Sequence, residues 1–399
     1  THSSYGSPNM SNKIAAAIGL IAAIGGFGDI ANARAPLRPE TESAKIAVEN
    51  VVQSEMTARG IPGLQLTIVR HNKIVFTGVY GQANIDAKTP VTEQTIFQIN
   101  SMSKAFAGVA AMQLVEAGQL DLDAPLTTYL EGLPASWRGI TVRQTLTHMS
   151  GLPEIVDDNL RLIDGAKPDI AWAKVQELPL DFSPGERFDY TQTNYVVLGK
   201  IIEKLKGKSF ADFVRDQQFD KVRMKRTDFA DTSDVVANAK PRVAQLYTFL
   251  TLLTQGTKTI GVERSKVPLV RNEQWTESLL PAGGVQTTST DLAKWIIAVQ
   301  KLKLVKKSSL EQLWKPQPQR DGTIRGFNSM INGYGLGWPS VQRAAHAAIT
   351  PIGGERAAIF IYPEDDLTVI VLTNLLGASP QKFVDKIASA YVPSLIIAN

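Results

Sequence analysis

Apolar and polar positions near the start of the sequence first follow a helical period and then alternate. Residues 42–59 carry apolar side chains at helical spacing, and Gly60 stands where it would cap the helix. Residues 64–69 and 74–80 then alternate as half-buried strands do, and residues 71–73 between them have turn character. This pattern predicts a helix followed by a β-hairpin.

The end of the sequence carries a similar pattern in the opposite order. Residues 357–362 and 367–373 are rich in β-forming residues, and residues 363–366 between them predict a turn. A helix is expected to follow over about 380–391. Both ends of the chain therefore predict helix plus antiparallel sheet.

The middle of the chain is dominated by helical periodicity, with loops rich in proline and glycine between the periodic segments. The periodic segments are residues 104–117, 142–147, 193–205, 210–219 and 291–302. The layout predicts an α+β protein, in which an antiparallel sheet flanked by helices holds an inserted all-helical subdomain. Residues 234–274 fit no clear pattern, and we interpret them as an insertion of uncertain structure.

The domain organisation follows from these patterns. Residues 1–9 are polar and featureless, and we interpret them as a cloning leader before a native start at Met10. Residues 10–41 are expected to be a signal peptide and linker, and residues 42–399 a single domain. The sheet part is expected at about 42–95 and 285–399, and the helical part at about 101–280.

The segment after Met10 has the features of a secretory signal peptide. Lys13 supplies a basic start, residues 14–27 are mostly apolar, and small residues at 31–33 fit a cleavage site. The prediction is a signal peptide over about 10–33, hence a secreted or periplasmic protein; an ordinary buried helix is the alternative. No other stretch approaches 18 uninterrupted apolar residues, so the mature chain is not expected to insert stably into a membrane.

Composition removes several kinds of chemistry. The chain has no cysteine, which excludes disulfides, thiolate metal sites and a cysteine nucleophile. Its net charge of +4 is spread along the chain without a basic block, so nucleic acid is not an expected partner. Four histidines leave little material for a histidine metal site or a Ser-His-Asp triad. The expected partner is a small-molecule or short-peptide substrate, and the sequence indicates no oligomeric state.

Ser101 and Lys104 form the informative short motif, Ser-x-x-Lys. On a helix they share a face, and a serine hydroxyl becomes a good nucleophile when a base takes its proton. Lysine can be that base if burial lowers its pKa, and the surrounding apolar residues favour burial. The alternative is that Ser101 merely caps a helix. The same spacing recurs at Ser379 and Lys382. There Ser379 followed by Pro380 indicates a capped helix start, and Lys382 is interpreted as a solvated side chain.

Tyr190 lies on a later segment that opens with Pro184 and Gly185. A tyrosine near a cation can be driven toward phenolate and could pass protons between nucleophile and leaving group. The alternative is a half-buried structural tyrosine.

Taken together, these motifs resemble those of the class C β-lactamase-related serine hydrolases, which include penicillin-binding DD-peptidases, D-amino-acid peptidases and β-lactamase-like esterases. Ser-x-x-Lys is followed by Pro-Gly-x-x-Phe-x-Tyr-x-x-x-x-Tyr-x-x-Leu-Gly at 184–199. Further similar blocks are residues 97–101, 146–152, 281–285, 290–293, 333–338 and 372–374. The resemblance spans about residue 42 to the C-terminus, and it implies this family's fold.

The resemblance also implies roles for individual residues. Ser101 would be the acylated nucleophile, Lys104 its base or electrostatic partner, and Tyr190 the proton shuttle, most needed when the acyl-enzyme is resolved. His148 would be structural. Gln192 stands where the family usually has asparagine, and it could donate to a substrate carbonyl from one methylene farther out. Such a mechanism needs neither metal nor cofactor.

The third family motif, normally Lys/His-x-Gly, is altered. The favoured match is Pro351-Ile352-Gly353, followed by Gly354, because paired glycines let a substrate approach the strand backbone. The alternative match begins at His346 and lacks the glycine. The oxyanion hole should then be the backbone N–H groups of Ser101 and Gly354.

Without a lysine or histidine there, strong β-lactamase or carboxypeptidase activity is less expected than hydrolysis of neutral esters or amides. Arg356 or Lys294 could substitute for the missing cation. The predicted function is an exported serine hydrolase of esterase or D-peptidase type, with weak β-lactamase activity possible. The alternative is a penicillin-binding-like binding or regulatory protein with impaired catalysis.

Overall fold

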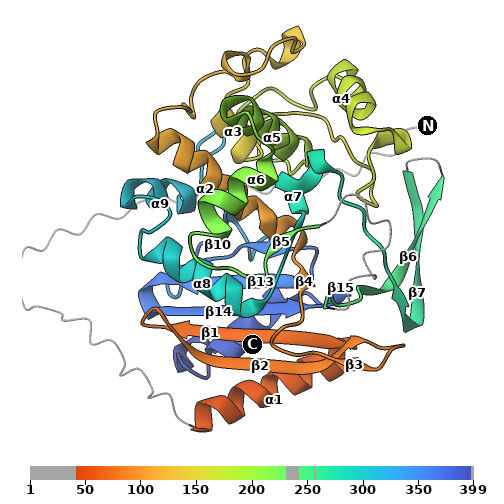
Figure 1. The fold of residues 1–399 in the computed structure, drawn as a ribbon, viewed down its shortest axis with the longest axis vertical. Helices are drawn as coiled ribbons and strands as arrows, with labels where there is room; N and C mark the ends of the chain where they lie inside the picture. Colours follow the sequence, from red (N-terminus) through yellow and green to blue (C-terminus); the bar gives the residue numbers. More distant parts are fainter. Residues whose placement is uncertain (1–41, 231–241, 256–257, 397–399) are drawn as a thin grey trace, which may run out of the picture. The chain divides into compact units, whose positions relative to one another are not determined.

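The computed structural model describes residues 42–230, 242–255 and 258–396. The predicted leader and signal peptide lie outside the described residues. Within the described part, nine strands form one sheet (Figure 1). Its order is β3-β2-β1-β14-β13-β11-β10-β9, and β12 pairs with β13 at the side.

The two ends of the chain meet in the centre of this sheet. Strand β1 (Gly63–Arg70) lies between β2 (Lys73–Asn84) and β14 (Leu367–Thr373), antiparallel to both. The next strand outward is β13 (Ala357–Tyr362). The predicted hairpins are therefore confirmed, and they share one sheet.

Successive side chains of the central strands enter two different cores. Val369 and Val371 of β14 pack in the core shared with helix α1 (Glu42–Arg59), whereas Ile370 and Leu372 pack in the core shared with the helical part. This is the two-residue period of a strand whose both faces are covered. Helix α10 (Val384–Ala388) packs beside α1, and α8 (Ser289–Gln300) packs on β1 and β14 from the other side.

The helical part is built around α2 (Ser103–Glu116), whose side chains are buried on nearly every face. Contacting α2 are α5 (Thr193–Lys206), α6 (Phe210–Val214), α7 (Leu280–Gly283) and α9 (Lys307–Trp314), while α3 (Val142–Leu146) packs on α5. Helix α4 (Pro168–Glu177) lies at the outside of this group (Figure 1). The mixed helix and antiparallel-sheet class predicted from the sequence is confirmed.

The remaining strands are short, apart from one hairpin. They are β3 (Thr89–Pro90), β4 (Phe97–Gln98), β5 (Asp228–Phe229), β8 (Val285–Thr287), β9 (Gly333–Tyr334), β10 (Pro339–Val341), β11 (Ala348–Ile349), β12 (Ile352–Gly353) and β15 (Leu375–Leu376). The hairpin consists of β6 (Tyr247–Gln255) and β7 (Lys258–Val270), and β15 adds to it in parallel.

Two local predictions differ from the structure. The segment 234–274, left without assigned structure, contains the long β6–β7 hairpin, so the inserted part is not all-helical. The C-terminal segment is a 3-10 turn (Pro380–Lys382) followed by the short α10, because Phe383 between them has φ −127° and interrupts the helix. In the part of the chain that the structure describes, we find no helix both long and apolar enough to cross a bilayer.

Candidate active site

Ser101 lies in a tight turn at the entrance to α2, beside the sheet. Strand β4 leads into a 3-10 turn (Asn100–Met102), and Asn100 in this turn has φ +47°. Ser101 is partly exposed, and Lys104, one turn into the helix, is only 1% exposed. Their side chains meet, with Nζ of Lys104 3.3 Å from Oγ of Ser101.

The surroundings of Lys104 suit a neutral amine. Burial lowers the pKa of Lys104 from 10.5 to about 7, although the nearby Glu154 carboxylate partly opposes this. Nζ also donates to Oε1 of Gln192 and to the carbonyl oxygen of Ala282, both at 2.7 Å. A neutral amine has two hydrogens, which these acceptors take, so its lone pair can accept the Ser101 hydroxyl proton once that hydroxyl turns away from Oδ1 of Asn100.

Tyr190 completes the cluster, but it is not driven toward phenolate as the sequence analysis expected. Burial raises the pKa of its phenol, and this outweighs the opposing hydrogen bonds from Ser101 and Gln192. Nζ of Lys104 lies over the face of the tyrosine ring, 4.7 Å from the centroid, in a cation–π position. Tyr190 therefore stays a protonated phenol at neutral pH, able to give one proton while it takes another.

The Gln192 side chain is part of the cluster. It is 8% exposed, its Oε1 accepts from Lys104, and its side chain is hydrogen-bonded to Tyr190. The longer side chain thus bridges the candidate base and the candidate proton shuttle. The expectation that Gln192 donates to a substrate carbonyl stays a prediction.

Glu154 is a site residue that the sequence analysis missed. Both of its carboxylate oxygens accept from the backbone N–H of Gln192, at 3.1 and 3.0 Å, and Oε1 also accepts from the N–H of Ile155 at 2.9 Å. Burial raises the pKa of Glu154, while these hydrogen bonds and the Lys104 charge lower it. Its place two residues after the 146–152 block was the available signal. The carboxylate fixes the backbone that aims Gln192 at Lys104.

His148 supports the tyrosine segment from behind. It is fully buried, its Nδ1 lies 3.0 Å from Nδ2 of Asn194 and 3.3 Å from the N–H of Thr191, and its ring lies 4.2 Å from that of Tyr190. Burial, followed by the Lys104 charge, holds the pKa of His148 well below 6.5. His148 is accordingly a neutral packing residue that joins the 146–152 block to the tyrosine segment.

The third motif lies against the nucleophile turn. Strand β12 pairs with β13, and a Cβ at Gly353 would lie 1.8 Å from the carbonyl oxygen of Ile99, so only glycine fits there. Gly353 and Gly354 line the same cleft as Ser101. His346 lies elsewhere, with Nδ1 2.9 Å from Asp365 and Nε2 2.9 Å from Ser394.

The backbone N–H of Ser101, predicted as half of the oxyanion hole, is already engaged. It donates to Oδ1 of Asn100 at 2.6 Å, and the Ser101 hydroxyl donates to the same oxygen at 2.9 Å. A substrate carbonyl at this position must compete with the Asn100 side chain.

The cleft at Ser101 has a volume of about 380 Å³. Apolar side chains contribute much of its lining: Leu160, Leu250, Leu252, Phe327, Ile352 and Leu376. Three carboxylates, Asp158, Glu273 and Glu355, and one guanidinium, Arg271, also line it.

Neither cation proposed to replace the third-motif lysine is available. Arg356 is fully buried and holds Glu273 through two hydrogen bonds of 3.1 and 2.7 Å. Lys294 pairs with Asp291 at 2.7 Å on helix α8. Both basic groups are therefore held in other contacts.

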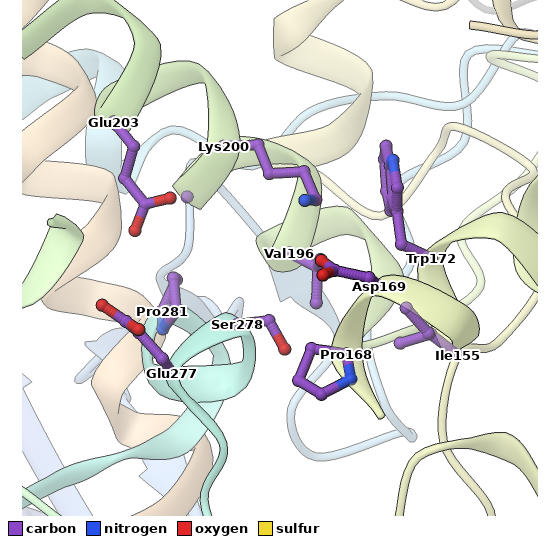
Figure 2. A pocket seen from close by; sticks show the side chains of 11 residues that line it. Ile155, Pro168, Asp169, Trp172, Val196, Lys200, Glu203, Glu277, Ser278 and Pro281 are labelled. Carbon is purple, nitrogen blue, oxygen red and sulfur yellow. The ribbon is translucent and has the colours of Figure 1, made fainter. Parts of the chain in front are cut away.

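A second cavity of about 200 Å³ lies between α4, α5 and the segment at α7 (Figure 2). Figure 2 shows the carboxylates of Glu203 and Glu277 on one side of it and Lys200 with Trp172 on the other. Nζ of Lys200 lies 4.6 Å from the Trp172 ring centroid. None of the candidate catalytic residues lines this cavity, so the chemistry belongs to the cleft at Ser101. Among the described residues, no cluster of three or more His, Asp or Glu side chains is placed to hold a metal ion.

Comparison with known proteins gives the relationship of the whole chain. The family model described as Beta-lactamase matches residues 48–392. Among curated proteins, Protein flp of Staphylococcus aureus (strain MW2) is 24% identical over 365 residues, which are 89% of this chain. The chain spans 66% of the length of that relative.

Solved structures with similar folds include the following two. The octameric penicillin-binding protein homologue from Pyrococcus abyssi is 26% identical, with a TM-score of 0.70 over 89% of this chain and 78% of that one. The D-amino acid amidase from Ochrobactrum anthropi SV3 is 21% identical, with a TM-score of 0.70 over 88% of this chain and 99% of that one. At that identity the amidase shows similarity of fold alone.

Proposed function

The chain belongs to the β-lactamase family and is a serine hydrolase of this superfamily, and we propose that it hydrolyses neutral esters or amides through an acyl intermediate on Ser101. The observation that carries the proposal is the environment of Lys104. This buried amine has a pKa lowered to about 7, two acceptors for its hydrogens and the Ser101 hydroxyl at 3.3 Å.

Acylation begins when the Ser101 proton moves to Nζ of Lys104. The serine oxygen then bonds to the substrate carbonyl carbon, and negative charge develops on the carbonyl oxygen. When the tetrahedral intermediate collapses, the bond to the leaving group breaks. The leaving group takes a proton from the Lys104 ammonium, directly or through the Tyr190 phenol.

Deacylation uses the same groups in the opposite direction. A water molecule attacks the acyl carbon while its proton passes through Tyr190 to Lys104. The bond between the acyl carbon and the serine oxygen breaks, and Ser101 recovers its proton from Lys104. The Tyr190 phenol suits this relay because it is hydrogen-bonded to both Ser101 and Gln192.

The charges around the cleft support a neutral substrate. Glu273 on the lining is paired with both Arg271 and Arg356. Two further lining carboxylates, Asp158 and Glu355, leave an excess of negative charge around the cleft. An anionic substrate would meet net repulsion at the lining. Neutral esters and amides, and D-aminoacyl derivatives with their cationic amino group, are therefore proposed ahead of the anionic β-lactams.

The competing function is a binding or regulatory protein with impaired catalysis. It is favoured by one observation, namely that Asn100 occupies the N–H of Ser101 that the oxyanion hole would use. On this reading a ligand would bind in the cleft without turnover.

Export is a separate proposal that rests on the sequence pattern of residues 10–33. Expression of the full-length chain, followed by cell fractionation and N-terminal sequencing, tests it. Export predicts a mature protein outside the cytoplasm with an N-terminus close to residue 34. A full-length cytoplasmic product would contradict it.

The function is tested with p-nitrophenyl esters, D-aminoacyl anilides and nitrocefin, together with a fluorophosphonate label. The proposal expects turnover of a neutral substrate and a mass adduct on Ser101, both absent in Ser101→Ala. Ser379→Ala, the serine of the second Ser-x-x-Lys, is the matched control and should keep both. Labelling without turnover favours the binding function, and an adduct at another residue overturns the assignment of Ser101.

A further inference from the structure

We propose that the cleft face of the β6–β7 hairpin is a subsite for an unbranched apolar acyl chain, with Leu250 and Leu252 as the residues that set its length preference. The inference deepens the proposed function and rests on it. It names the substrate class as neutral esters of medium-chain aliphatic acids.

The first observation is the apolar wall itself. Leu250 and Leu252 are two residues apart on β6, so their side chains leave the strand on the same face, and both line the cleft that contains Ser101. Leu376 extends this wall, because β15 pairs with β6 through Leu376 and Thr248. Leu250 is 38% exposed, so apolar surface remains there for a ligand to cover.

The second observation is that the hairpin is tied to the opposite side of the cleft. Thr259 of β7 donates a hydrogen bond from its hydroxyl to Asp158, which lies on the cleft lining beside Leu160. At its base, Glu273 follows β7 and is held by the buried Arg356. The wall is thus fixed at both ends, as a length-selective subsite requires.

The third observation assigns the wall to the acyl group. The leaving group must reach a proton from Lys104 or Tyr190, and Tyr190 packs against Phe327 with ring centroids 5.1 Å apart. The leaving group is therefore placed toward the tyrosine and Phe327. The acyl chain is directed toward the apolar surface away from Tyr190, of which Leu250, Leu252 and Leu376 form the hairpin side.

Leu253 provides a matched control on the same strand. It follows Leu252 directly, so its side chain leaves the other face of β6. It is 39% exposed, almost the same as Leu250, and it does not line the cleft. A general effect of losing a hairpin leucine would appear in Leu253→Ser as well.

The test measures kcat/KM for p-nitrophenyl esters from acetate to decanoate. Each methylene buried in the subsite should raise kcat/KM by about fourfold until the wall is filled. The double variant Leu250→Ser/Leu252→Ser should lower the octanoate-to-acetate ratio by at least tenfold, and Leu253→Ser should leave it unchanged. An unchanged ratio in the double variant, or an equal fall in Leu253→Ser, overturns the subsite.

Binding to the Ser101→Ala variant separates this inference from the proposed function. Calorimetry of the same esters with Ser101→Ala should show affinity that rises with chain length, and the slope should disappear when Leu250→Ser/Leu252→Ser is added. A slope that persists in that triple variant overturns the subsite. Chain-length-dependent binding without turnover by the wild type overturns the hydrolase proposal while supporting the subsite. Turnover without any dependence on chain length supports the hydrolase proposal and overturns the subsite.

Discussion

At the scale of single residues, the chemistry of the site depends on which groups surround one buried amine. Lys104 has two strong acceptors and one hydroxyl within reach, and the carboxylate of Glu154 raises its pKa against the larger effect of burial. Gln192 links the two titratable groups, because its side chain contacts the Lys104 amine and its backbone N–H contacts the Glu154 carboxylate. Lys104, Gln192 and Glu154 therefore jointly determine whether the Lys104 amine holds its extra proton.

The first prediction concerns the pH dependence of activity. Since the neutral amine is the base, kcat/KM should rise with pH through an apparent pKa near 7. Glu154→Gln removes the charge that raises the pKa of Lys104, so this limb should move to lower pH. The pH–rate profile of wild type and variant with one activated ester measures the shift. A limb that moves to higher pH would contradict the assigned role of Glu154.

The Glu154→Gln variant keeps an acceptor oxygen for the N–H of Gln192, so the local backbone should be retained. Glu154→Ala removes the acceptor as well as the charge, and it should also lower kcat because Gln192 is no longer held toward Lys104. Loss of activity in both variants without any shift of the profile would indicate a purely structural carboxylate.

The second prediction separates the two halves of the reaction at Tyr190. Ser101 and Lys104 touch directly, so acylation has a proton acceptor without the tyrosine, whereas the attacking water depends on the relay. Tyr190→Phe should lower kcat by about 10²–10⁴ and make the acyl-enzyme accumulate. Burst kinetics and intact mass spectrometry detect the intermediate. Tyr129→Phe, a tyrosine outside the cleft, is the control and should show neither effect.

Sequence reasoning reached some of these residues and not others, for physical reasons. The burial of Lys104 followed from its apolar neighbours along the chain. The contact between Glu154 and Gln192 joins positions 38 residues apart through a backbone N–H, which leaves no local pattern. The contacts of the Gln192 amide could not be predicted either, because they depend on which neighbours the longer side chain reaches in the folded protein.

At the scale of elements, predictions succeeded where the period was uninterrupted. The bounds of α1, β13 and β14 agree with the predicted ranges, because α1 has a regular buried stripe and the two strands are continuous runs of β-forming residues buried at every position. The β6–β7 hairpin was missed because its ladder contains two register shifts, between Thr248 and Leu250 and between Leu253 and Thr254. Each shift breaks the two-residue alternation by which a strand is recognised.

The third prediction concerns how this hairpin is anchored to the sheet. Glu273, which follows β7, is 3% exposed and pairs with Arg356 at the start of β13, which is 0% exposed. Glu273→Ala leaves a buried guanidinium without its partner and should lower the free energy of unfolding by about 3–5 kcal/mol. Urea unfolding measures it. The exposed Glu311→Ala should change stability by less than about 0.5 kcal/mol.

The double variant Glu273→Leu/Arg356→Met decides whether the charge is the cause. Replacing both members of a buried pair with apolar residues removes the uncompensated charge, so most of the lost stability should return. A double variant that remains as unstable as Glu273→Ala would show that packing, and not the ion pair, holds the hairpin segment to β13.

At the scale of the whole molecule, the catalytic amine is also a cost to the folded state. An unfolded lysine has a pKa of 10.5, whereas burial lowers the pKa of Lys104 to about 7. Between these values the unfolded chain binds more protons than the folded chain, so the contribution of Lys104 to stability rises with pH across this range. Below about pH 7 the folded state bears the full penalty of keeping a charged amine buried.

The last prediction uses Lys104→Met, which removes the titrating group and keeps an unbranched side chain that is one atom shorter. The variant loses the bonds to Gln192 and Ala282 at every pH, so its absolute stability is not the informative quantity. The informative quantity is the difference in unfolding free energy between wild type and variant, measured by urea at pH 7 and pH 10. Between pH 7 and pH 10 this difference should change in favour of the wild type by up to roughly 4 kcal/mol, because these three pH units lie between the folded and unfolded pKa values.

The exposed Lys307→Met should show no comparable change between the two pH values. A difference for Lys104→Met that stays constant with pH would mean that the amine titrates alike in the folded and unfolded chains. Lys104 would then be charged at neutral pH and could not act as the base for Ser101.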